Sequence, residues 1–444
     1  MIDRLSRFRD GAGRIADNPL MLAGPVPGVV DLRKVGLMLA PPVTTGEFVP
    51  VSFWHGIELE PPEPITPRAH PDGLRAAFTE AVRDMTAGTD TIGVMVSGGL
   101  DSLAVLVHAC DIAEGRRVIA FVIEMTDDLG GSSAAEVHRL IRAFDLDIEL
   151  VVLDPHHDRA EPVWSPAGPH LHGLPEVNAA AAERAADLGV DLILSGDGSD
   201  ELLGVPRYAT AAIARRHGIP AAVRYAHDAA SSGPGLFGEA AAVLSRLLPA
   251  RTTASLYWAV NWPDDWCDPV APAVLAEPYR TEATAWAKQW VSDHVVAHAT
   301  TRRTWSVADA YDALFPHTAL LPAGNIEEGS PFLHPSFLAA ALALPLGDRY
   351  QAALPTRYWR CKAQVINLFP QNKVKALPRQ KQYFSTALTD QAATLDTAKP
   401  LVAVEVGLID PDQLRHETNT SVLLFVAAIE RWLAGALRHG AQIG

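Results

Sequence analysis

Apolar and amphipathic segments alternate along residues 70–195. Short apolar runs have the length and composition of buried strands, at 91–96, 117–125, 147–153 and 190–194. Between and before them, apolar residues recur at the spacing of a helix, at 74–85, 103–113, 134–144 and 177–188. Strands that alternate with helices in this way build a parallel sheet with helices on both faces. The pattern therefore predicts an α/β fold for this part of the chain.

The pattern changes on both sides of this region. Residues before 60 are rich in Pro, Val and Gly, with β-like runs such as 48–54 and a Pro-rich joint at 60–67. After residue 206, Ala-rich amphipathic runs predict helices, at 240–248, 283–297, 337–344, 362–369 and 421–437. We therefore expect three parts: a β-rich segment with its linker (1–66), an α/β subdomain (67–206) and a helical subdomain (207–444).

Composition narrows the setting of the protein. The 444 residues carry 52 acidic against 37 basic side chains, a net charge of −15, which argues against a chain that coats nucleic acid. The three cysteines lie far apart, so a disulfide framework or a thiolate zinc site is not expected. The start resembles no signal peptide, and the most apolar runs, 337–346 and 422–429, are shorter than the about 18 residues of a membrane span. We expect a cytoplasmic protein with no nucleic-acid or membrane partner.

The sharpest motif is VSGGLDS at residues 96–102, between a predicted strand and a predicted helix. Ligands bind at such turns, because they lie at the carboxyl end of a parallel strand. The two glycines let backbone N–H groups approach an anion, and the following helix adds its positive end. Ser97 and Ser102 can donate to phosphate oxygens, whereas Asp101 suits a phosphate only through a bridging Mg²⁺. The alternative is an ordinary glycine turn capped by polar residues.

A second glycine turn, SGDGSDELLG at 195–204, follows the predicted strand 190–194 and carries acidic residues. Asp200 and Glu201 could simply be favourable charges at a helix start. Two acidic, glycine-rich loops at two strand ends also suit one magnesium-bound nucleotide. No Walker motif, G-x-x-x-x-G-K-[ST], occurs in the chain.

These motifs resemble those of a known superfamily. Residues 97–102 resemble the PP-loop of N-type ATP pyrophosphatases, and 195–204 resemble the S-G-[DE]-G-[SG]-D-E-L-F-G-G-Y motif of the asparagine synthetase family. That family includes β-lactam and carbapenam synthetases and lasso-peptide cyclases. Further similar segments lie at 325–334, 377–384 and 429–433, so the resemblance covers about residues 72–435. This chain departs from the family at Leu203 (Phe in relatives), Gly329 (Arg) and His334 (Asp).

The resemblance implies a parallel sheet of PP-loop type, similar to adenine nucleotide alpha hydrolases, with a helical C-terminal subdomain. It also implies an enzyme that uses ATP and Mg²⁺ to adenylate a carboxylate and pass the acyl group to an amine, with release of AMP and pyrophosphate. The ATP-binding residues would be Val96, Ser97, Gly98, Gly99, Asp101, Ser102, Ile123, Ser195 and Gly196. Asp101 and Asp200 would hold the metal, Lys381 would stabilise developing charge, Asp197 would take a proton from the amine, and Glu327 would orient the nucleophile.

The resemblance leaves the substrate open. Glutamine-hydrolysing relatives expose a cysteine at position 2, whereas this chain has Ile2 and no cysteine before Cys110, so we expect no glutamine hydrolysis and take residues 1–66 as a vestigial segment. The partner would be a small molecule or peptide that carries both carboxylate and amine, as in macrolactam formation by a lasso-peptide cyclase. A precursor peptide and a companion protease would then accompany it.

Other interpretations remain. An asparagine synthetase-like enzyme would use free ammonia. A PP-loop enzyme that modifies tRNA would need a basic face and often a C-x-x-C, and the sequence has no C-x-x-C. A catalytically inactive scaffold would be expected to lose some of Asp101, Asp200 and Lys381. Trp258, Trp262 and Trp266 could form a peptide-binding wall, although such tryptophans are more often part of a core.

Overall fold

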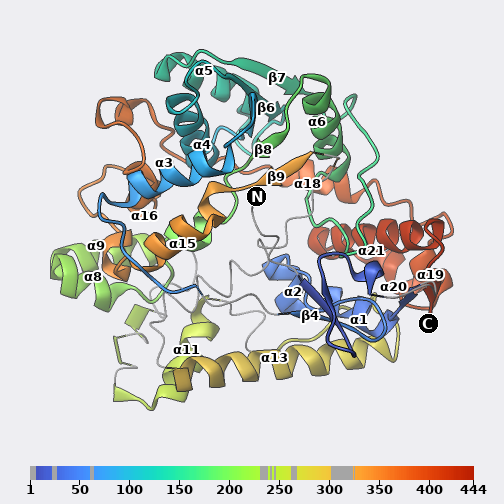
Figure 1. Ribbon diagram of the computed structural model, residues 1–444. Coiled ribbons are helices and arrows are strands. Elements are labelled where there is room, and N and C mark those ends of the chain that lie inside the picture. The colour runs from blue at the N-terminus through green and yellow to red at the C-terminus, as the bar shows by residue number, and fades with distance from the viewer. Residues whose placement is uncertain are drawn as a thin grey trace.

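A computed structural model gives the fold of the chain (Figure 1). It describes residues 7–22, 28–60, 65–230, 239–261 without 241–242 and 245–246, 268–301, 324 and 326–444. Within these ranges, the predicted α/β region and the mainly helical region both occur.

The α/β part contains a five-stranded sheet in the order β7-β6-β5-β8-β9, and every neighbouring pair is parallel. The strands are β5 (Thr91–Met95), β6 (Arg117–Ile123), β7 (Glu149–Leu153), β8 (Leu192–Leu194) and β9 (Glu327–Gly329). The first four confirm the strands predicted from the apolar runs. Since β5 lies at the centre, its carboxyl end is flanked by those of β6 and β8. This edge is where the two glycine loops begin.

Helices cover both faces of the sheet, as the pattern predicts. They are α3 (Leu74–Met85), α4 (Leu100–Asp111), α5 (Ser133–Phe144) and α6 (Pro175–Asp187). Alternate residues of β6 separate two cores, because side chains alternate across a strand. Val118, Ala120 and Val122 join the core that contains residues of α3, α4 and α5, whereas Ile119, Phe121 and Ile123 join the core that contains residues of α6.

The strand β9 was not predicted. Its sequence, Glu-Glu-Gly, contains no apolar run, so nothing in the local pattern distinguishes it from a loop. It pairs with β8 in parallel, with Gly329 opposite Leu194. The sheet therefore takes one strand from the region predicted as a helical subdomain, and the expected boundary at residue 206 cuts through the sheet.

The rest of the chain after β8 is mainly helical in the described residues. The predicted run 362–369 is helical only at α17 (Ala363–Ile366), because the helix ends there in a turn at residues 367–368. Of the predicted run 240–248, residues 241–242 and 245–246 lie outside the described residues. The helices are α7 (Ser199–Leu203), α8 (Thr210–His217), α9 (Ile219–Ala230), α11 (Ala250–Asn261), α13 (Tyr279–Thr301), α15 (Pro335–Leu342), α16 (Arg357–Cys361), α17 (Ala363–Ile366), α18 (Ser385–Ala392), α19 (Val402–Glu405), α20 (Pro411–His416) and α21 (Thr420–Arg438).

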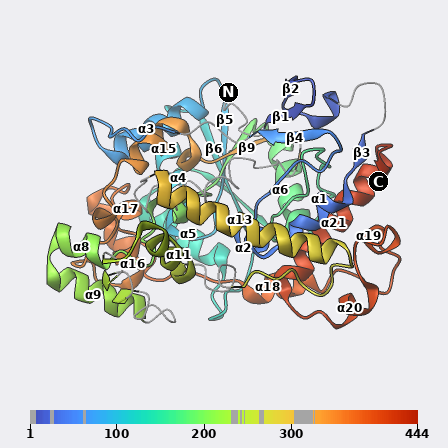
Figure 2. The ribbon, with the colours of Figure 1, turned by 90° about the horizontal axis from the view of Figure 1, so that it is seen from below.

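The N-terminal segment packs with the C-terminal helices. It contains β1 (Arg7–Asp10), β2 (Ile15–Ala16), β3 (Val29–Val30), α1 (Leu32–Gly36), α2 (Pro41–Gly46) and β4 (Ile57–Glu60), and β3 pairs in parallel with β10 (Gln442–Ile443). The predicted strand at 48–54 is wrong, because in that run only Trp54 makes a bridge, to Val30. The long helix α13 runs from α11 to α1 along one side of the molecule (Figures 1 and 2).

Helix α21 is the one described helix that is long and apolar enough to cross a membrane by length and composition. Half of its apolar window is buried inside the protein. Val426, Ile429 and Leu433 lie in the core that α21 shares with the N-terminal segment. The apolar face of α21 therefore packs in the core of the protein.

Candidate active site

The two glycine loops touch at the carboxyl edge of the sheet. A Cβ atom on Gly196 would lie 2.8 Å from the backbone nitrogen of Ser102 and 3.0 Å from the carbonyl carbon of Asp101. Only a glycine allows this approach, because both contacts are with backbone atoms. A hydrogen bond from the Ser199 hydroxyl to Oδ1 of Asp101 joins the loops a second time. The sequence-predicted pair of loops therefore forms one site.

The PP-loop (residues 97–102) has a compact backbone. Gly98 adopts φ +78°, a conformation that side chains rarely allow. The backbone N–H of Ser97 donates to the Ser102 hydroxyl at 3.1 Å, and the two hydroxyls lie 3.3 Å apart. Helix α4 begins within this motif, at Leu100. Loop amides and a helix N-terminus together favour an anion at this position.

Two lysines meet the two predicted metal-binding carboxylates. Nζ of Lys362 lies 2.7 Å from Oδ1 of Asp101 and 2.5 Å from Oδ1 of Asp200. Nζ of Lys381 lies 2.9 Å from Oδ2 of Asp200. The side chain of Lys362 is 6% exposed, whereas that of Lys381 is 44% exposed. One lysine is thus buried inside the cluster and the other lies at its surface.

The charges of the cluster hold one another in the ionised form. Burial raises the pKa of Asp200, but the neighbouring ammonium groups of Lys362 and Lys381 outweigh it and lower that pKa to about 2. Burial lowers the pKa of Lys362, but Asp101 and Asp200 outweigh it, so the pKa lies above its usual range. The pKa of Lys381 is likewise raised, because the charge of Asp200 outweighs burial. Asp200 and both lysines are therefore charged at neutral pH.

Sequence reasoning missed Lys362. Its position at the start of the apolar run 362–369 is the one available signal, because a lysine there needs either solvent or an acidic partner. Its partners lie 261 and 162 residues away in the sequence, so local pattern gives no indication of the contact.

The carboxylates fit a magnesium ion that is bound together with phosphates. No group of three or more His, Cys, Asp or Glu side chains suited to a metal occurs among the described residues, so no all-protein cage is present there. Asp101 and Asp200 contact the same ammonium group and offer hard oxygen donors. Mg²⁺ is usually held by one or two carboxylates, with substrate phosphates and water completing the shell.

The segment 377–385, which carries Lys381, is hydrogen-bonded to the loop that follows β6. Gln382 donates to Asp127 at 3.0 Å, and the backbone N–H of Asp128 donates to the carbonyl of Tyr383 at 2.8 Å. Ser385 donates to Asp128 from both its backbone nitrogen and its hydroxyl, each at 2.9 Å. These bonds fix the backbone directly after Lys381.

The four residues predicted to line the adenosine lie together. Val96 follows β5, Ile123 ends β6, and Ser195 and Gly196 follow β8, which are three adjacent strands of the sheet. The backbone N–H of Val96 donates to the carbonyl of Phe121, which keeps the chain beside β6 beyond the end of β5. A ligand at this edge would contact all three strand ends.

A comparison with protein families supports this arrangement. The family model described as asparagine synthase matches residues 73–432, which is well over half of the chain. The chain belongs to the asparagine synthase family. The match includes both glycine loops, both lysines and all five strands of the parallel sheet. A search of curated proteins finds no match. Family membership makes the chain an ATP-dependent, amide-bond-forming synthetase in general type, that is, a ligase.

Of the remaining candidate catalytic residues, Asp197 lies in the second glycine loop and Glu327 lies in β9. Oδ2 of Asp197 accepts a hydrogen bond from the Ser195 hydroxyl at 2.7 Å, and the carbonyl of Asp197 accepts one from Ser330 at 2.7 Å. Asp197 is therefore held in the second loop. Glu327 is exposed and begins β9 opposite Leu192, two residues before the carboxyl end of that strand. The structure does not bring Glu327 into the cluster.

Two positions that depart from the asparagine synthase pattern lie beside the second glycine loop and at the start of a helix. The carbonyl of Gly329 accepts a hydrogen bond from the backbone of Ser195 at 2.8 Å. His334 precedes α15, and its Nδ1 lies 2.8 Å from the Ser336 hydroxyl.

Trp258 is buried and its indole donates to His298, so it belongs to a core between α11 and α13. Trp262 and Trp266 lie outside the described residues.

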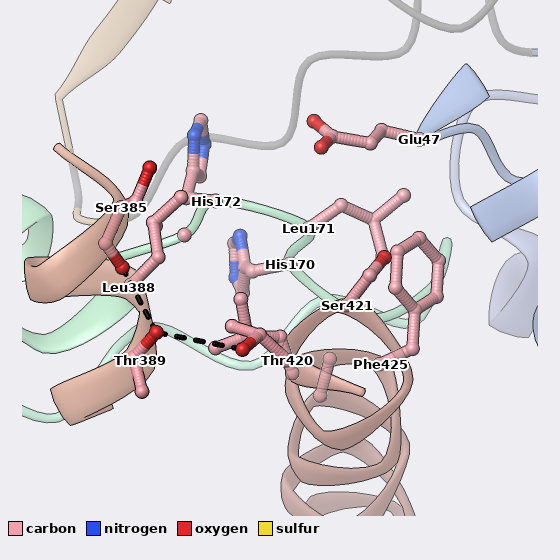
Figure 3. Close-up of a pocket in the computed structure, with 13 residues that line it drawn as sticks. Glu47, His170, Leu171, His172, Ser385, Leu388, Thr389, Thr420, Ser421 and Phe425 are labelled. Carbon is pink, nitrogen blue, oxygen red and sulfur yellow. Dashed lines mark hydrogen bonds between the residues drawn. The ribbon is translucent and has the colours of Figure 1, made fainter. Parts of the chain in front are cut away.

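A cavity of about 320 Å³ lies between α18, α21, the 170–173 loop and Glu47 at the end of α2. Figure 3 shows Glu47 on the far side of the cavity from Ser385 and Leu388. The wall of the cavity combines polar side chains, including His172, with apolar ones such as Phe425. Ser385, which lines the cavity, is four residues after Lys381, so the Cα atoms of the two residues lie at most about 14 Å apart.

Proposed function

We propose that this member of the asparagine synthase family adenylates a carboxylate and transfers the acyl group to an amine carried by its own substrate. The observation that carries the proposal is the cluster in which Asp101 and Asp200, from two touching glycine loops, share one buried lysine and face a second, partly exposed one. Such a cluster suits a triphosphate with a divalent metal, and Lys381 is open to a reacting group beside it.

In the first half-reaction, a carboxylate oxygen of the substrate attacks the α-phosphorus of ATP, and the bond to the bridging oxygen of pyrophosphate breaks. Residues 97–102 bind the phosphate oxygens through backbone N–H groups and the hydroxyls of Ser97 and Ser102. A magnesium ion held by Asp101 and Asp200 would neutralise charge on the departing pyrophosphate. Lys381 stabilises the negative charge that develops on the phosphate and, later, on the acyl oxygen.

In the second half-reaction, the amine nitrogen attacks the acyl carbon, AMP leaves with the electron pair of the broken bond, and the amine loses a proton. Asp197 is the proposed acceptor of that proton. Ser195 occupies its Oδ2, which leaves Oδ1 with no partner among the described residues. A carboxylate held by one hydrogen bond in this way is oriented and still able to bind a proton.

The cavity supports a substrate larger than aspartate with ammonia. About 320 Å³ beside the 377–385 segment suits a side chain or a short peptide turn, for which an ammonia-using enzyme has no need. Gly329 and His334, which depart from the family pattern, also argue against aspartate as the substrate. We propose macrolactam or other natural-product amide formation in the cytoplasm, with a precursor peptide and a companion protease as partners. Ammonia use is the second candidate, and the charge of −15 disfavours a tRNA substrate.

Pyrophosphate release against a panel of amino acids, peptides with free amino and side-chain carboxyl groups, and simple acids with ammonia tests the proposal. We expect release with one class of acid and formation of an amide and AMP in equal amounts. Asp101→Ala and Lys381→Ala are the controls. Unchanged turnover in either variant would rule out the assigned site, and release that requires free ammonia would favour the second candidate.

The cavity has its own test. Leu388→Trp fills it, and Leu437→Trp is a matched control, because Leu437 is also partly exposed on a helix but does not line the cavity. We expect the KM for the amine-bearing substrate to rise about tenfold or more in the first variant only, with the KM for ATP unchanged in both. Equal KM values in Leu388→Trp and the wild type would contradict a role of the cavity in substrate binding.

A further inference from the structure

The buried ammonium of Lys362 lies in the position where a metal ion would bind. It contacts Oδ1 of both Asp101 and Asp200, at 2.7 and 2.5 Å. The Oδ2 atom of Asp200 contacts Lys381. Of the four carboxylate oxygens, only Oδ2 of Asp101 has no partner among the described residues. A magnesium ion needs such oxygens at about 2.1 Å, so it competes with Lys362 for the same atoms.

The charges of the cluster lead to the same conclusion. Asp101 and Asp200 contribute two negative charges, and Lys362 and Lys381 contribute two positive ones, so the four side chains are neutral together. A free divalent ion gains little from a neutral cluster and is repelled by a buried ammonium at close range. A triphosphate changes this balance, because it brings negative charge that attracts both the metal and the lysines.

We propose that Lys362 holds the cation position between Asp101 and Asp200 while no nucleotide is bound, so that the divalent metal enters only together with ATP. The triphosphate then draws the ammonium away from the carboxylates. This inference rests on the proposed ATP-dependent function. Lys362 acts as a positioning residue in this scheme: it keeps two carboxylates from different loops together before the nucleotide arrives.

The position of Lys362 at the break between α16 and α17 fits this role. Its backbone φ and ψ of −111° and 26° interrupt the helix. Arg360, two residues earlier, is anchored by a buried bidentate ion pair to Asp228. The backbone that presents Lys362 is therefore fixed, and the side chain is the part that can move.

Metal binding to the nucleotide-free protein tests the proposal, with Mn²⁺ alone as the probe and electron paramagnetic resonance or calorimetry as the readout. We expect wild-type protein to bind Mn²⁺ at least tenfold more tightly in the presence of β,γ-imido-ATP than in its absence. Lys362→Met is expected to bind Mn²⁺ alone at least tenfold more tightly than wild type. Lys381→Met should change this affinity less, because Lys381 contacts Asp200 only.

Two results would overturn the proposal. The first is tight Mn²⁺ binding by nucleotide-free wild-type protein, equal to that with the ATP analogue, and it needs no variant. The second is the absence of any gain in Mn²⁺ affinity in a folded Lys362→Met protein. Failure of wild-type protein to bind β,γ-imido-ATP at any metal concentration would instead remove the proposed function, so the two failures are distinguishable.

Discussion

Breaking the buried ion pair between Arg360 and Asp228 is expected to lower the free energy of unfolding far more than breaking an exposed pair. Nε and Nη2 of Arg360 donate to the two oxygens of Asp228 at 2.6 and 2.7 Å, and the hydroxyl of Tyr350 donates to Asp228 at 2.7 Å. All three side chains are buried. Asp228→Ala would leave a guanidinium and a phenol without this partner in the interior.

The magnitude follows from what remains. Removing one member of a buried pair costs about 3–5 kcal/mol. Arg360 keeps hydrogen bonds from Nη1 to the carbonyls of Leu354 and Pro355, both at 3.1 Å, which retain part of its stabilisation. We therefore expect the lower part of that range, about 3–4 kcal/mol at pH 7.

Urea unfolding followed by circular dichroism measures the loss in free energy of unfolding. Arg216→Ala is the control: Arg216 pairs with Asp348 at 2.6 Å but is 59% exposed, so its loss should cost no more than about 1 kcal/mol. If Asp228→Ala costs as little as the control, the assumed energetic weight of the buried pair is wrong.

The pH dependence supplies a second check. Burial raises the pKa of Asp228, but hydrogen bonds from Arg360 and Tyr350 outweigh it and hold the pKa below its ordinary value of 3.8. The carboxylate therefore stabilises the fold fully above that ordinary value, and this contribution is lost as the pH falls through the lower, folded-state pKa. The stability difference between wild type and Asp228→Asn should narrow below about pH 4. A difference that stays constant down to pH 2 would contradict this reasoning.

Three further predictions concern the active site and the C-terminal core. Lys381→Ala should lower kcat by about 10²–10³ in pyrophosphate release with the free energy of unfolding changed by less than about 1 kcal/mol, and a loss under tenfold would argue against its role. Gly196→Ala places a Cβ 2.8 Å from the backbone nitrogen of Ser102 and should weaken ATP-analogue binding about tenfold or more in calorimetry; unchanged affinity would mean that the loops can separate freely. Gly435→Ala drives a Cβ into the ring of Trp164 and should cost about 1–3 kcal/mol in urea unfolding, whereas a neutral result would show that the indole moves aside.

The sequence predicts the α/β region well because its strands are continuous apolar runs and its helices are amphipathic. Both signals are local. Strand β9 has neither signal, since only its pairing with β8 makes it a strand. The wrong strand at 48–54 contains Pro50, which lacks the backbone donor that a sheet needs.

The same distinction applies to the site. The two loops were found because their glycines and acids lie in short motifs, and the structure brings Asp101 and Asp200 together as expected. Lys362 could not be found in this way, because its role depends on contacts between distant segments. Glu327 matched a motif, but the register of β9 keeps it two residues away from the strand end.

The pairing of β3 with β10 has a consequence for biosynthesis. Val29 and Val30 form a parallel ladder with Gln442 and Ile443, so some 400 residues must leave the ribosome between the first partner and the second. At bacterial or eukaryotic elongation rates this takes on the order of 20 to 80 s. Throughout that time the apolar surface of the N-terminal segment lacks the helix α21 that covers it in the finished protein. We therefore expect the nascent chain to depend on chaperones at its N-terminal end. The α/β part with the five-stranded parallel sheet should be the first part to fold.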